Sequence, residues 1–325
     1  MADMSFRRLG SSGLAVSVVG LGCNNFGRRI DADQTAAVVD AAIDCGITLF
    51  DTADIYGTPH GASEEFLGAA LRANGHRDDV LIATKFGSDM EGVNGPDWGA
   101  RGGRRYIQRA VEASLRRLGV DHIDLYQLHQ PDPQTPIAET LSALDDVVRA
   151  GKVRYIGSSQ FSGWQVADAA WTAQSNHTVP FVSAQNEYSL LRRQIEAHLV
   201  PACERFDVGI LPFFPLANGL LTGKYRQGEA APAGTRLSNE RFAGWLSGAP
   251  WEMINKLDQY ARERSLTLLD VAIGGLAAQP AVASVISGAT SPEQVRANAA
   301  AGGWAPSPAD LLELNAITTA ANPVW

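Results

Sequence analysis

The chain has 325 residues, of which 45% are hydrophobic, and carries a formal net charge of -8 at pH 7. That hydrophobic share is enough for a large core, and the length fits either two domains or one α/β barrel. No run rich in lysine and arginine is present, which argues against a partner such as nucleic acid or an anionic membrane. Three cysteines, Cys23, Cys45 and Cys203, stand in no motif spacing, so we expect a reducing compartment and no disulfides.

Neither the N-terminal residues nor the uncharged segment 271–292 favours export or membrane insertion. Residues 1–13 lack the apolar core of a signal peptide, and we expect a cytoplasmic protein. The uncharged segment 271–292 is long enough to span a bilayer. Its proline, glutamine, serines and glycines instead favour a helix end, a loop and a buried strand.

From the N-terminus, the chain first predicts a small hairpin and then an alternation of strands and helices. The hairpin pairs Phe6–Arg8 with Leu14–Val18 around a Gly-Ser-Ser-Gly turn. Eight short apolar runs predict buried strands at 18–21, 47–50, 80–84, 123–128, 153–157, 181–184, 208–213 and 282–286. Helical periodicity and end signals predict helices at 33–45, 63–72, 106–118, 136–150, 163–174, 195–205, 253–264, 268–277, from 291, and 308–320.

One helix start and one long segment of this pattern carry further signals. Thr135 suits the N-cap of the helix that begins at Pro136. The segment Pro215–Pro250 has no clear periodicity, and irregular segments of that length tend to be functional.

Eight strand–helix units, with strands buried on both faces, predict a closed (β/α)8 TIM barrel. No linker or change of composition divides the chain, so we expect a single domain over residues 1–325 with the hairpin at its start. A doubly wound open sheet is the alternative, although such sheets usually have fewer strands. In a barrel, the chemistry lies at the carboxyl ends of the strands.

Polar side chains follow three consecutive predicted strands. Asp51 and Tyr56 lie in the stretch FDTADIYG at 50–57, Lys85 follows the third strand, and His129 follows the fourth. Singly, each has an ordinary structural interpretation as a turn residue, a surface lysine or a core histidine. Together they predict machinery that moves one proton to or from an oxygen. Lys85 would lower the pKa of Tyr56, Asp51 would keep Lys85 charged, and His129 would polarise a carbonyl oxygen.

Other kinds of chemistry have little support. The chain contains no GxSxG elbow and no placed Cys–His pair, so no nucleophile is indicated. We expect no metal, because HExxH is absent and His122 and His129, seven apart on one strand, point to opposite faces.

At these residues the sequence resembles the aldo-keto reductase superfamily, over nearly the whole chain. The matching blocks are FDTADIYG at 50–57, ATKFG at 83–87, DLYQLHQPD at 124–132, GKVRYIGSSQF at 151–161, SAQNEYSLL at 183–191, PLANGLLTGKY at 215–225 and SVISGATSPEQVRAN at 284–298. The branch it resembles most includes bacterial general reductases and the β subunits of potassium channels.

The resemblance implies that Asp51, Tyr56, Lys85 and His129 are a catalytic tetrad, with Tyr56 as general acid. It implies NADPH as cofactor, with NADH as the alternative, bound without a Rossmann fold. Together with the positions of the residues that follow the predicted strands, the resemblance implies cofactor contacts at Cys23, Asn24, Asp51, Ser159, Gln160, Gln185, Phe213, Leu216, Gly219, Lys224, Gly288, Thr290, Gln294 and Asn298. Phe213 falls where the family usually has the aromatic ring that stacks on the nicotinamide.

One departure concerns the cofactor's 2′-phosphate. Family members often carry lysine or arginine after the last strand, whereas this chain has Gly288 to Ser291 and then Gln294. We therefore expect hydroxyls, an amide and helix N-terminal N–H groups to hold the phosphate. Neutral donors bind it more weakly than a guanidinium, so the expected preference for NADPH is narrow.

The expected activity is reduction of a small aldehyde or ketone to an alcohol. Substrate contacts are expected at Phe26, Ile55, Tyr56, Trp98 and His129, and the aromatics between 242 and 251 could join them, although loop packing explains several of these residues equally well. Two alternatives stay open: a sugar or alcohol dehydrogenase that works in the oxidative direction, and a regulatory protein that binds the cofactor and turns over slowly. The sequence does not indicate the physiological substrate or the oligomeric state.

Overall fold

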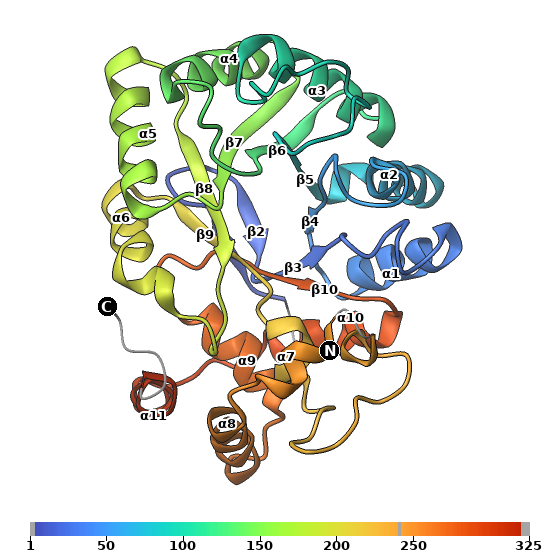
Figure 1. The fold of residues 1–325 in the computed structure, drawn as a ribbon, viewed down its shortest axis with the longest axis vertical. Coiled ribbons are helices and arrows are strands. Elements are labelled where there is room, and N and C mark those ends of the chain that lie inside the picture. Colours follow the sequence, from blue (N-terminus) through green and yellow to red (C-terminus); the bar gives the residue numbers. More distant parts are fainter. Residues whose placement is uncertain (1–3, 240–241, 320–325) are drawn as a thin grey trace.

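Eight parallel strands form a barrel in the computed structural model, which describes residues 4–239 and 242–319 (Figure 1). The strands are β3 (Val19–Gly22), β4 (Leu49–Asp51), β5 (Leu81–Phe86), β6 (Ile123–Leu128), β7 (Val153–Ser159), β8 (Phe181–Glu187), β9 (Gly209–Phe213) and β10 (Val285–Gly288). Their order is β10-β3-β4-β5-β6-β7-β8-β9. A parallel bridge between Ile210 and Val282 joins β9 to the approach of β10 and closes the ring. The predicted (β/α)8 fold is confirmed.

The predicted hairpin is also present and closes one end of the barrel. Strands β1 (Phe6–Arg8) and β2 (Ala15–Ser17) pair antiparallel. Leu9 and Val16 are fully buried and belong to the apolar cluster that fills the barrel interior. The N–H of Ser11 donates to the carbonyl oxygen of Asp207, just before β9, at 2.7 Å. Since the N-terminal end is plugged, a cavity can open only at the carboxyl end of the strands.

Helices surround the barrel in the order that the sequence predicts. They are α1 (Ala32–Asp44), α2 (Ala62–Asn74), α3 (Arg104–Leu118), α4 (Ile137–Arg149), α5 (Gly163–Asn176), α6 (Leu199–Phe206), α8 (Trp251–Glu263), α9 (Leu268–Ala277), α10 (Pro292–Ala301) and α11 (Pro308–Thr319). A short 3-10 turn, η1 (Arg77–Asp79), precedes β5. The predicted last residue of α11, Ala320, lies outside the described residues.

Two predictions about helix starts are wrong: the helix expected from 195 begins at Leu199, and Thr135 does not cap α4. The single helix expected over 195–205 is a 3-10 turn, η2 (Gln194–Ala197), followed by α6. Pro201 has no N–H to donate one turn back, so the helix restarts at Leu199, which places Pro201 in a first turn. In α4 the N-cap is Pro136, with no side-chain cap, and Thr135 donates to Asp132 at 2.7 Å instead.

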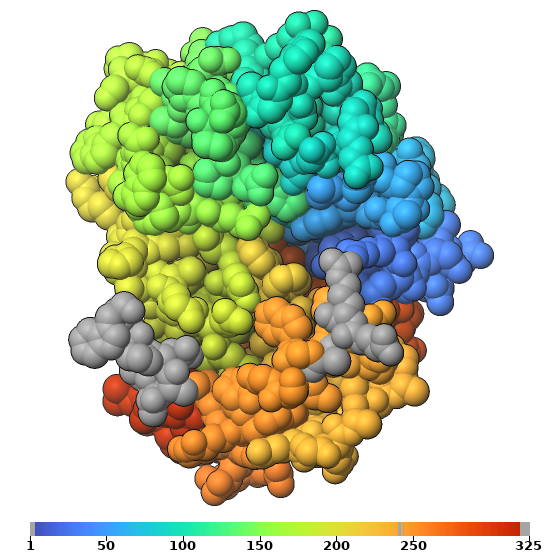
Figure 2. Space-filling view, in the orientation of Figure 1, coloured from blue at the N-terminus to red at the C-terminus, as the bar shows by residue number. Residues whose placement is uncertain are grey.

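The segment 215–250 is more ordered than the sequence suggests. It contains η3 (Ala217–Thr222), η4 (Arg236–Ser238) and α7 (Ala243–Ser247). Leu220, Leu221 and Leu237 are buried in a second apolar cluster with α8 and α9. Packing therefore holds this segment against the barrel, and Figure 2 shows it, in orange, beside a hollow in the surface.

The apolar segment 271–292 consists of the end of α9, a connection, β10 and the first residue of α10. Within the described part of the chain, no helix combines the length and the apolar character that crossing a membrane requires.

Candidate active site

The four residues predicted at the strand ends lie together at the carboxyl end of the barrel. Asp51 is the last residue of β4, Tyr56 lies in the loop that follows it, Lys85 is the penultimate residue of β5, and His129 follows β6. The Nζ of Lys85 donates to Oδ2 of Asp51 at 2.6 Å and to the carbonyl oxygen of Thr52 at 2.8 Å. That Nζ lies 5.0 Å from the centroid of the Tyr56 ring. The rings of Tyr56 and His129 meet edge to face, with centroids 5.8 Å apart.

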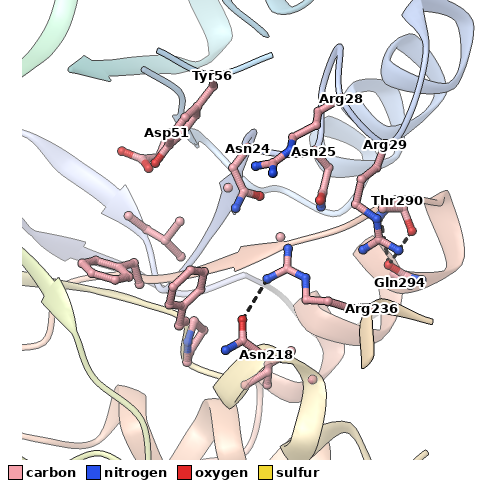
Figure 3. A pocket seen from close by; sticks show the side chains of 18 of the residues that line it. Asn24, Asn25, Arg28, Arg29, Asp51, Tyr56, Asn218, Arg236, Thr290 and Gln294 are labelled. Carbon is pink, nitrogen blue, oxygen red and sulfur yellow. Dashed lines mark hydrogen bonds between the residues drawn. The ribbon is translucent and has the colours of Figure 1, made fainter. Parts of the chain in front are cut away.

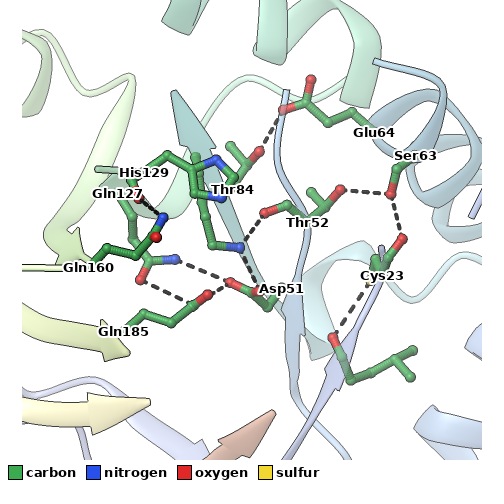
Figure 4. A network of polar contacts seen from close by, with 12 residues as sticks. Cys23, Asp51, Thr52, Ser63, Glu64, Thr84, Gln127, His129, Gln160 and Gln185 are labelled. Atoms are coloured by element: carbon green, nitrogen blue, oxygen red, sulfur yellow. Dashed lines mark hydrogen bonds and ion pairs between the residues drawn. The ribbon is translucent and has the colours of Figure 1, made fainter. Parts of the chain in front are cut away.

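Amide side chains complete the environment of Asp51. Its Oδ1 accepts from Nε2 of Gln185 at 2.8 Å and from Nε2 of Gln127 at 3.2 Å (Figure 4). With Lys85 on the other oxygen, the buried carboxylate has a partner for each oxygen, as a buried charge requires.

Burial and charge compete over the pKa values of Lys85 and Tyr56. Burial lowers the pKa of Lys85, but Asp51 and then Tyr56 act in the opposite direction and leave it above the ordinary value. Burial raises the pKa of Tyr56, and the Lys85 charge opposes this without outweighing it. Lys85 acts on the Tyr56 pKa in the expected direction, but it does not bring that pKa below its ordinary value, because desolvation of the phenolate dominates. At neutral pH the site holds a charged ammonium beside a protonated phenol.

His129 is uncharged at neutral pH. Burial, followed by the nearby Lys85 charge, lowers its pKa to about 3. Its Nδ1 lies 3.2 Å from the hydroxyl of Ser88. When that hydroxyl donates, the ring proton resides on Nε2, so the imidazole is a neutral hydrogen-bond donor. The side chain of Gln160 donates to the His129 carbonyl oxygen at 3.0 Å and fixes the strand end (Figure 4).

A cavity of about 900 Å³ extends from these residues along the mouth of the barrel. The predicted site residues that line it are Asn24, Asp51, Ile55, Tyr56, His129, Ser159, Gln160, Gln185, Phe213, Leu216, Gly219, Lys224, Gly288, Thr290, Gln294 and Asn298. Segments far apart in the sequence thus supply one continuous wall.

Four predicted site residues lie outside that wall. Lys85 is buried beneath it, paired with Asp51. Cys23 is fully buried, its thiol donates to the Leu21 carbonyl, and burial, with Asp51 as the next cause, raises its pKa well above the ordinary value. Phe26 is fully buried in the core, and Trp98 is 68% exposed, with its ring against the Arg105 guanidinium. The expected aromatics between 242 and 251 are also not among the described lining residues.

Several lining residues were not predicted from the sequence. Three are arginines: Arg28 and Arg29 in the loop after β3, and Arg236 in η4 (Figure 3). Thr58 and His60 line the wall near Tyr56, and Asn218 and Thr222 belong to η3. A signal for the first pair was present, because Arg28 and Arg29 closely follow Asn24 in the same strand-end loop. Among the described residues, no group of three or more His, Cys, Asp or Glu could hold a metal ion.

Comparisons with known proteins point in one direction. The model of the "Aldo/keto reductase family" matches residues 18–317. A "Probable voltage-gated potassium channel subunit beta" from Oryza sativa subsp. japonica is 34% identical, over 91% of this chain and 90% of its own. An "L-glyceraldehyde 3-phosphate reductase" from Escherichia coli (strain K12) is 34% identical, over 91% of this chain and 87% of its own. "Aldo-keto reductase YhdN" from Bacillus subtilis (strain 168) is 33% identical, over 99% and 96%. Each of these alignments spans nearly the whole chain.

Proposed function

The chain belongs to the aldo/keto reductase family, and from that premise we propose that it reduces aldehyde or ketone carbonyls to alcohols with NADPH. The catalytic residues in this proposal are Asp51, Tyr56, Lys85 and His129. The observation that carries it is the contact between Tyr56, the Lys85–Asp51 pair and His129 at one end of a large cavity. One domain over residues 1–325 and a cytoplasmic location are part of the same proposal.

The residues of the cavity fit a nicotinamide dinucleotide. At the catalytic end, Ser159, Gln160 and Gln185 offer hydroxyl and amide groups, and Phe213 offers an aromatic face. Gly219, Lys224, Thr290, Gln294 and Asn298 line the same cavity. When bound, the cofactor supplies the hydride that reduces the carbonyl carbon.

Tyr56 would supply the proton in this reaction. A protonated phenol can give its proton to the carbonyl oxygen as negative charge develops there. The Lys85 ammonium stabilises the phenolate that remains, and Asp51 keeps that ammonium in place. Water then returns a proton to Tyr56, and the product is a neutral alcohol.

His129 would orient and polarise the carbonyl without protonating it. Its neutral ring donates a hydrogen bond more readily than a proton, since its pKa of about 3 leaves no charge to lose at neutral pH. Ile55 lines the same end of the cavity and supplies an apolar contact for the substrate. Phe26 and Trp98 have no part in this proposal, because neither lines the cavity.

The test is NADPH consumption across aldehydes, ketones and sugars, with Tyr56→Phe as the decisive variant. This substitution removes the proton donor and keeps the ring. We expect turnover to fall by about two to four orders of magnitude, while the affinity for NADPH stays within a few fold. A variant with near-normal turnover would reject Tyr56 as the acid.

The same assay separates the two alternatives. Faster oxidation of sugars or alcohols with NADP⁺ at matched pH would favour a dehydrogenase. Tight cofactor binding with no turnover on any carbonyl would favour a regulatory protein that binds the cofactor.

A further inference from the structure

Three arginines from two distant parts of the chain line the cavity near Thr290 and Gln294 (Figure 3). We propose that Arg28, Arg29 and Arg236 form a clamp for a phosphomonoester, the 2′-phosphate of NADPH. The clamp would replace the lysine or arginine that this chain lacks after its last strand. This inference rests on the proposed function, because it assigns residues to that cofactor.

Hydrogen bonds of the loop after β3 position Arg28 and Arg29 near the carboxyl end of β10. The carbonyl oxygen of Asn25 accepts the N–H groups of Arg28 at 3.2 Å, Arg29 at 2.8 Å and Ile30 at 3.2 Å. The side chain of Asn25 donates to the carbonyl oxygen of Ala289 at 3.1 Å. Because β3 and β10 are neighbours in the barrel, this one residue fixes both arginines beside the segment expected to receive the adenosine.

Arg236 approaches from the opposite wall. It lies in η4, its Nη1 donates to Oδ1 of Asn218 at 3.1 Å, and its guanidinium lies 6.0 Å from the Phe214 ring centroid. Burial, followed by the charges of Arg29 and Arg28, lowers the pKa of Arg236. The charges of Arg28 and Arg29 are therefore close enough to Arg236 to disfavour its charged form.

These charges are not neutralised within the described part of the chain. None of the three arginines forms a salt bridge there, whereas Arg101, for example, pairs with Asp97 at 2.5 Å and with Asp89 at 2.8 Å. Like charges held close together repel, and an anion between them removes that cost. Guanidinium groups match phosphate oxygens in geometry as well as in charge, so a phosphate is the anion that fits.

The neutral donors expected from the sequence are already engaged with each other. The N–H and the hydroxyl of Thr290 both donate to Oε1 of Gln294, at 2.9 and 3.2 Å. The hydroxyl of Ser291 accepts the N–H of Gln294 as the N-cap of α10. These bonds complete the start of the helix. Within the described part of the chain, the guanidinium groups of Arg28 and Arg29 form no hydrogen bond, and Arg236 uses one N–H on Asn218, so most of their donors can reach a phosphate. The preference for NADPH should consequently be wide, in contrast to the narrow margin expected from the sequence.

Calorimetric titration with adenosine 2′,5′-bisphosphate and adenosine 5′-monophosphate tests the clamp without turnover. The two ligands differ only in the 2′-phosphate. We expect the wild type to prefer the bisphosphate by at least about a hundredfold, and Arg29→Gln or Arg28→Gln to remove about tenfold or more of that preference each. Arg236→Gln should do the same, and NADPH should lose affinity in parallel while NADH changes less than about twofold.

Arg296→Gln is the matched control. Arg296 lies in α10 close to the site in sequence, yet it pairs with Glu293 at 3.9 Å and does not line the cavity. The variant removes the same charge and should leave both titrations unchanged. An equal loss of bisphosphate affinity in Arg296→Gln would show that the effect comes from net charge alone, and this would overturn the clamp.

Three further results would overturn it. Equal losses for NADPH and NADH would assign the arginines to the pyrophosphate. Unchanged NADPH affinity, with a raised KM for a phosphorylated aldehyde but not for its unphosphorylated analogue, would assign them to a substrate. Equal affinity of the wild type for the two adenosine ligands would leave no 2′-phosphate site. A different result separates the two proposals. If the bisphosphate binds and this binding depends on the arginines, but no carbonyl is reduced, the clamp stands and the proposed reductase activity is rejected.

Discussion

Tyr56 owes its protonated state to burial, and Lys85 modulates that state without reversing it. A phenol in water is a weak acid with a pKa of about 10. Burial beside the barrel raises the pKa of Tyr56 further, and the Lys85 ammonium, 5.0 Å from the ring centroid, opposes that rise. In the proposed reaction, the lysine would therefore matter most after proton transfer, when a phenolate needs a counter-charge.

Lys85→Met removes this counter-charge at similar side-chain length. Carbonyl reduction should fall by at least about a hundredfold, and Asp51 should be left without its cation. Without Lys85 the pKa of Tyr56 rises further, so the rate of alcohol oxidation, which needs the phenolate, should increase only at higher pH. Lys152→Met, which breaks a surface pair with Glu112, is the control. A pH–rate profile identical to that of the wild type would place Lys85 outside the chemistry.

His129 links the site to stability in acid. Its pKa is about 3 in the folded protein and about 6.5 when unfolded, so the unfolded state binds more protons between these values. Stability is therefore complete above pH 6.5 and is lost as the pH falls. Between pH 7 and pH 5 the loss from this one residue should be up to about 2 kcal/mol. Urea unfolding at both pH values should show a smaller loss in His129→Gln.

His76→Gln is the control for that measurement, because its side chain is 46% exposed and remains hydrated in both states. An acid-dependent loss of the same size in His129→Gln and in the wild type would show that other groups carry it.

Among the secondary-structure elements, a buried ionic network joins α2 and α3 to β5 behind the site. Glu64 of α2 is fully buried and accepts from Thr84 of β5 at 2.6 Å (Figure 4). It also accepts from Arg117 of α3 at 2.6 Å. Arg117 also donates to Asn94 at 3.0 Å, and Asn94 donates to the buried Asp54 at 2.9 Å. Since Thr84 precedes Lys85 and Asp54 lies two residues before Tyr56, the network supports the backbone that presents these two residues, which we propose to be catalytic.

Arg117→Met should cost about 3–5 kcal/mol of unfolding free energy, because it leaves Glu64 charged and unpaired in the interior. The double variant Glu64→Gln/Arg117→Met should recover part of that loss. Urea denaturation of the two variants measures the difference. A double variant that is no more stable than Arg117→Met would mean that Glu64 does not carry an uncompensated charge.

Local signals in the sequence predicted which elements form, and they failed where two signals compete. The apolar stripe across 195–205 favours one helix, yet the missing N–H of Pro201 divides it. Thr135 is a good capping residue, but its hydroxyl has a closer partner in Asp132. The proximity of Asp51, Tyr56, Lys85 and His129 was predictable, because each lies at a strand end or in the loop that follows it. The pKa of Tyr56 was not, since the sequence shows the neighbouring charge but not the depth of burial.

For the molecule as a whole, closure of the barrel explains which site residues were missed. The sequence separates Asn25 from Ala289 by 264 positions, and the hydrogen bond between them forms only because β3 and β10 are adjacent. The residues from Ser287 to Val295, after the last predicted strand, include no cation, whereas Arg28 and Arg29 from the loop after β3 line the same cavity. The two ends of the barrel have different roles in this proposal: the carboxyl ends of the strands carry the chemistry, and the hairpin closes the opposite end.

That division predicts that changes in the hairpin affect stability and leave the site intact. Gly10 has φ +55, and a Cβ there would lie 2.5 Å from the carbonyl oxygens of Asp207 and Val182. Gly10→Ala should therefore cost roughly 2–4 kcal/mol, from the left-handed backbone and the close contact. Gly13→Ala in the same hairpin is the control, because its Cβ would meet only the Tyr155 hydroxyl at 3.9 Å. Urea unfolding should separate the two variants, whereas the NADPH dissociation constant, measured where both are folded, should match the wild type. A weakened cofactor affinity in folded Gly10→Ala would show that the hairpin end and the catalytic end of the barrel are coupled.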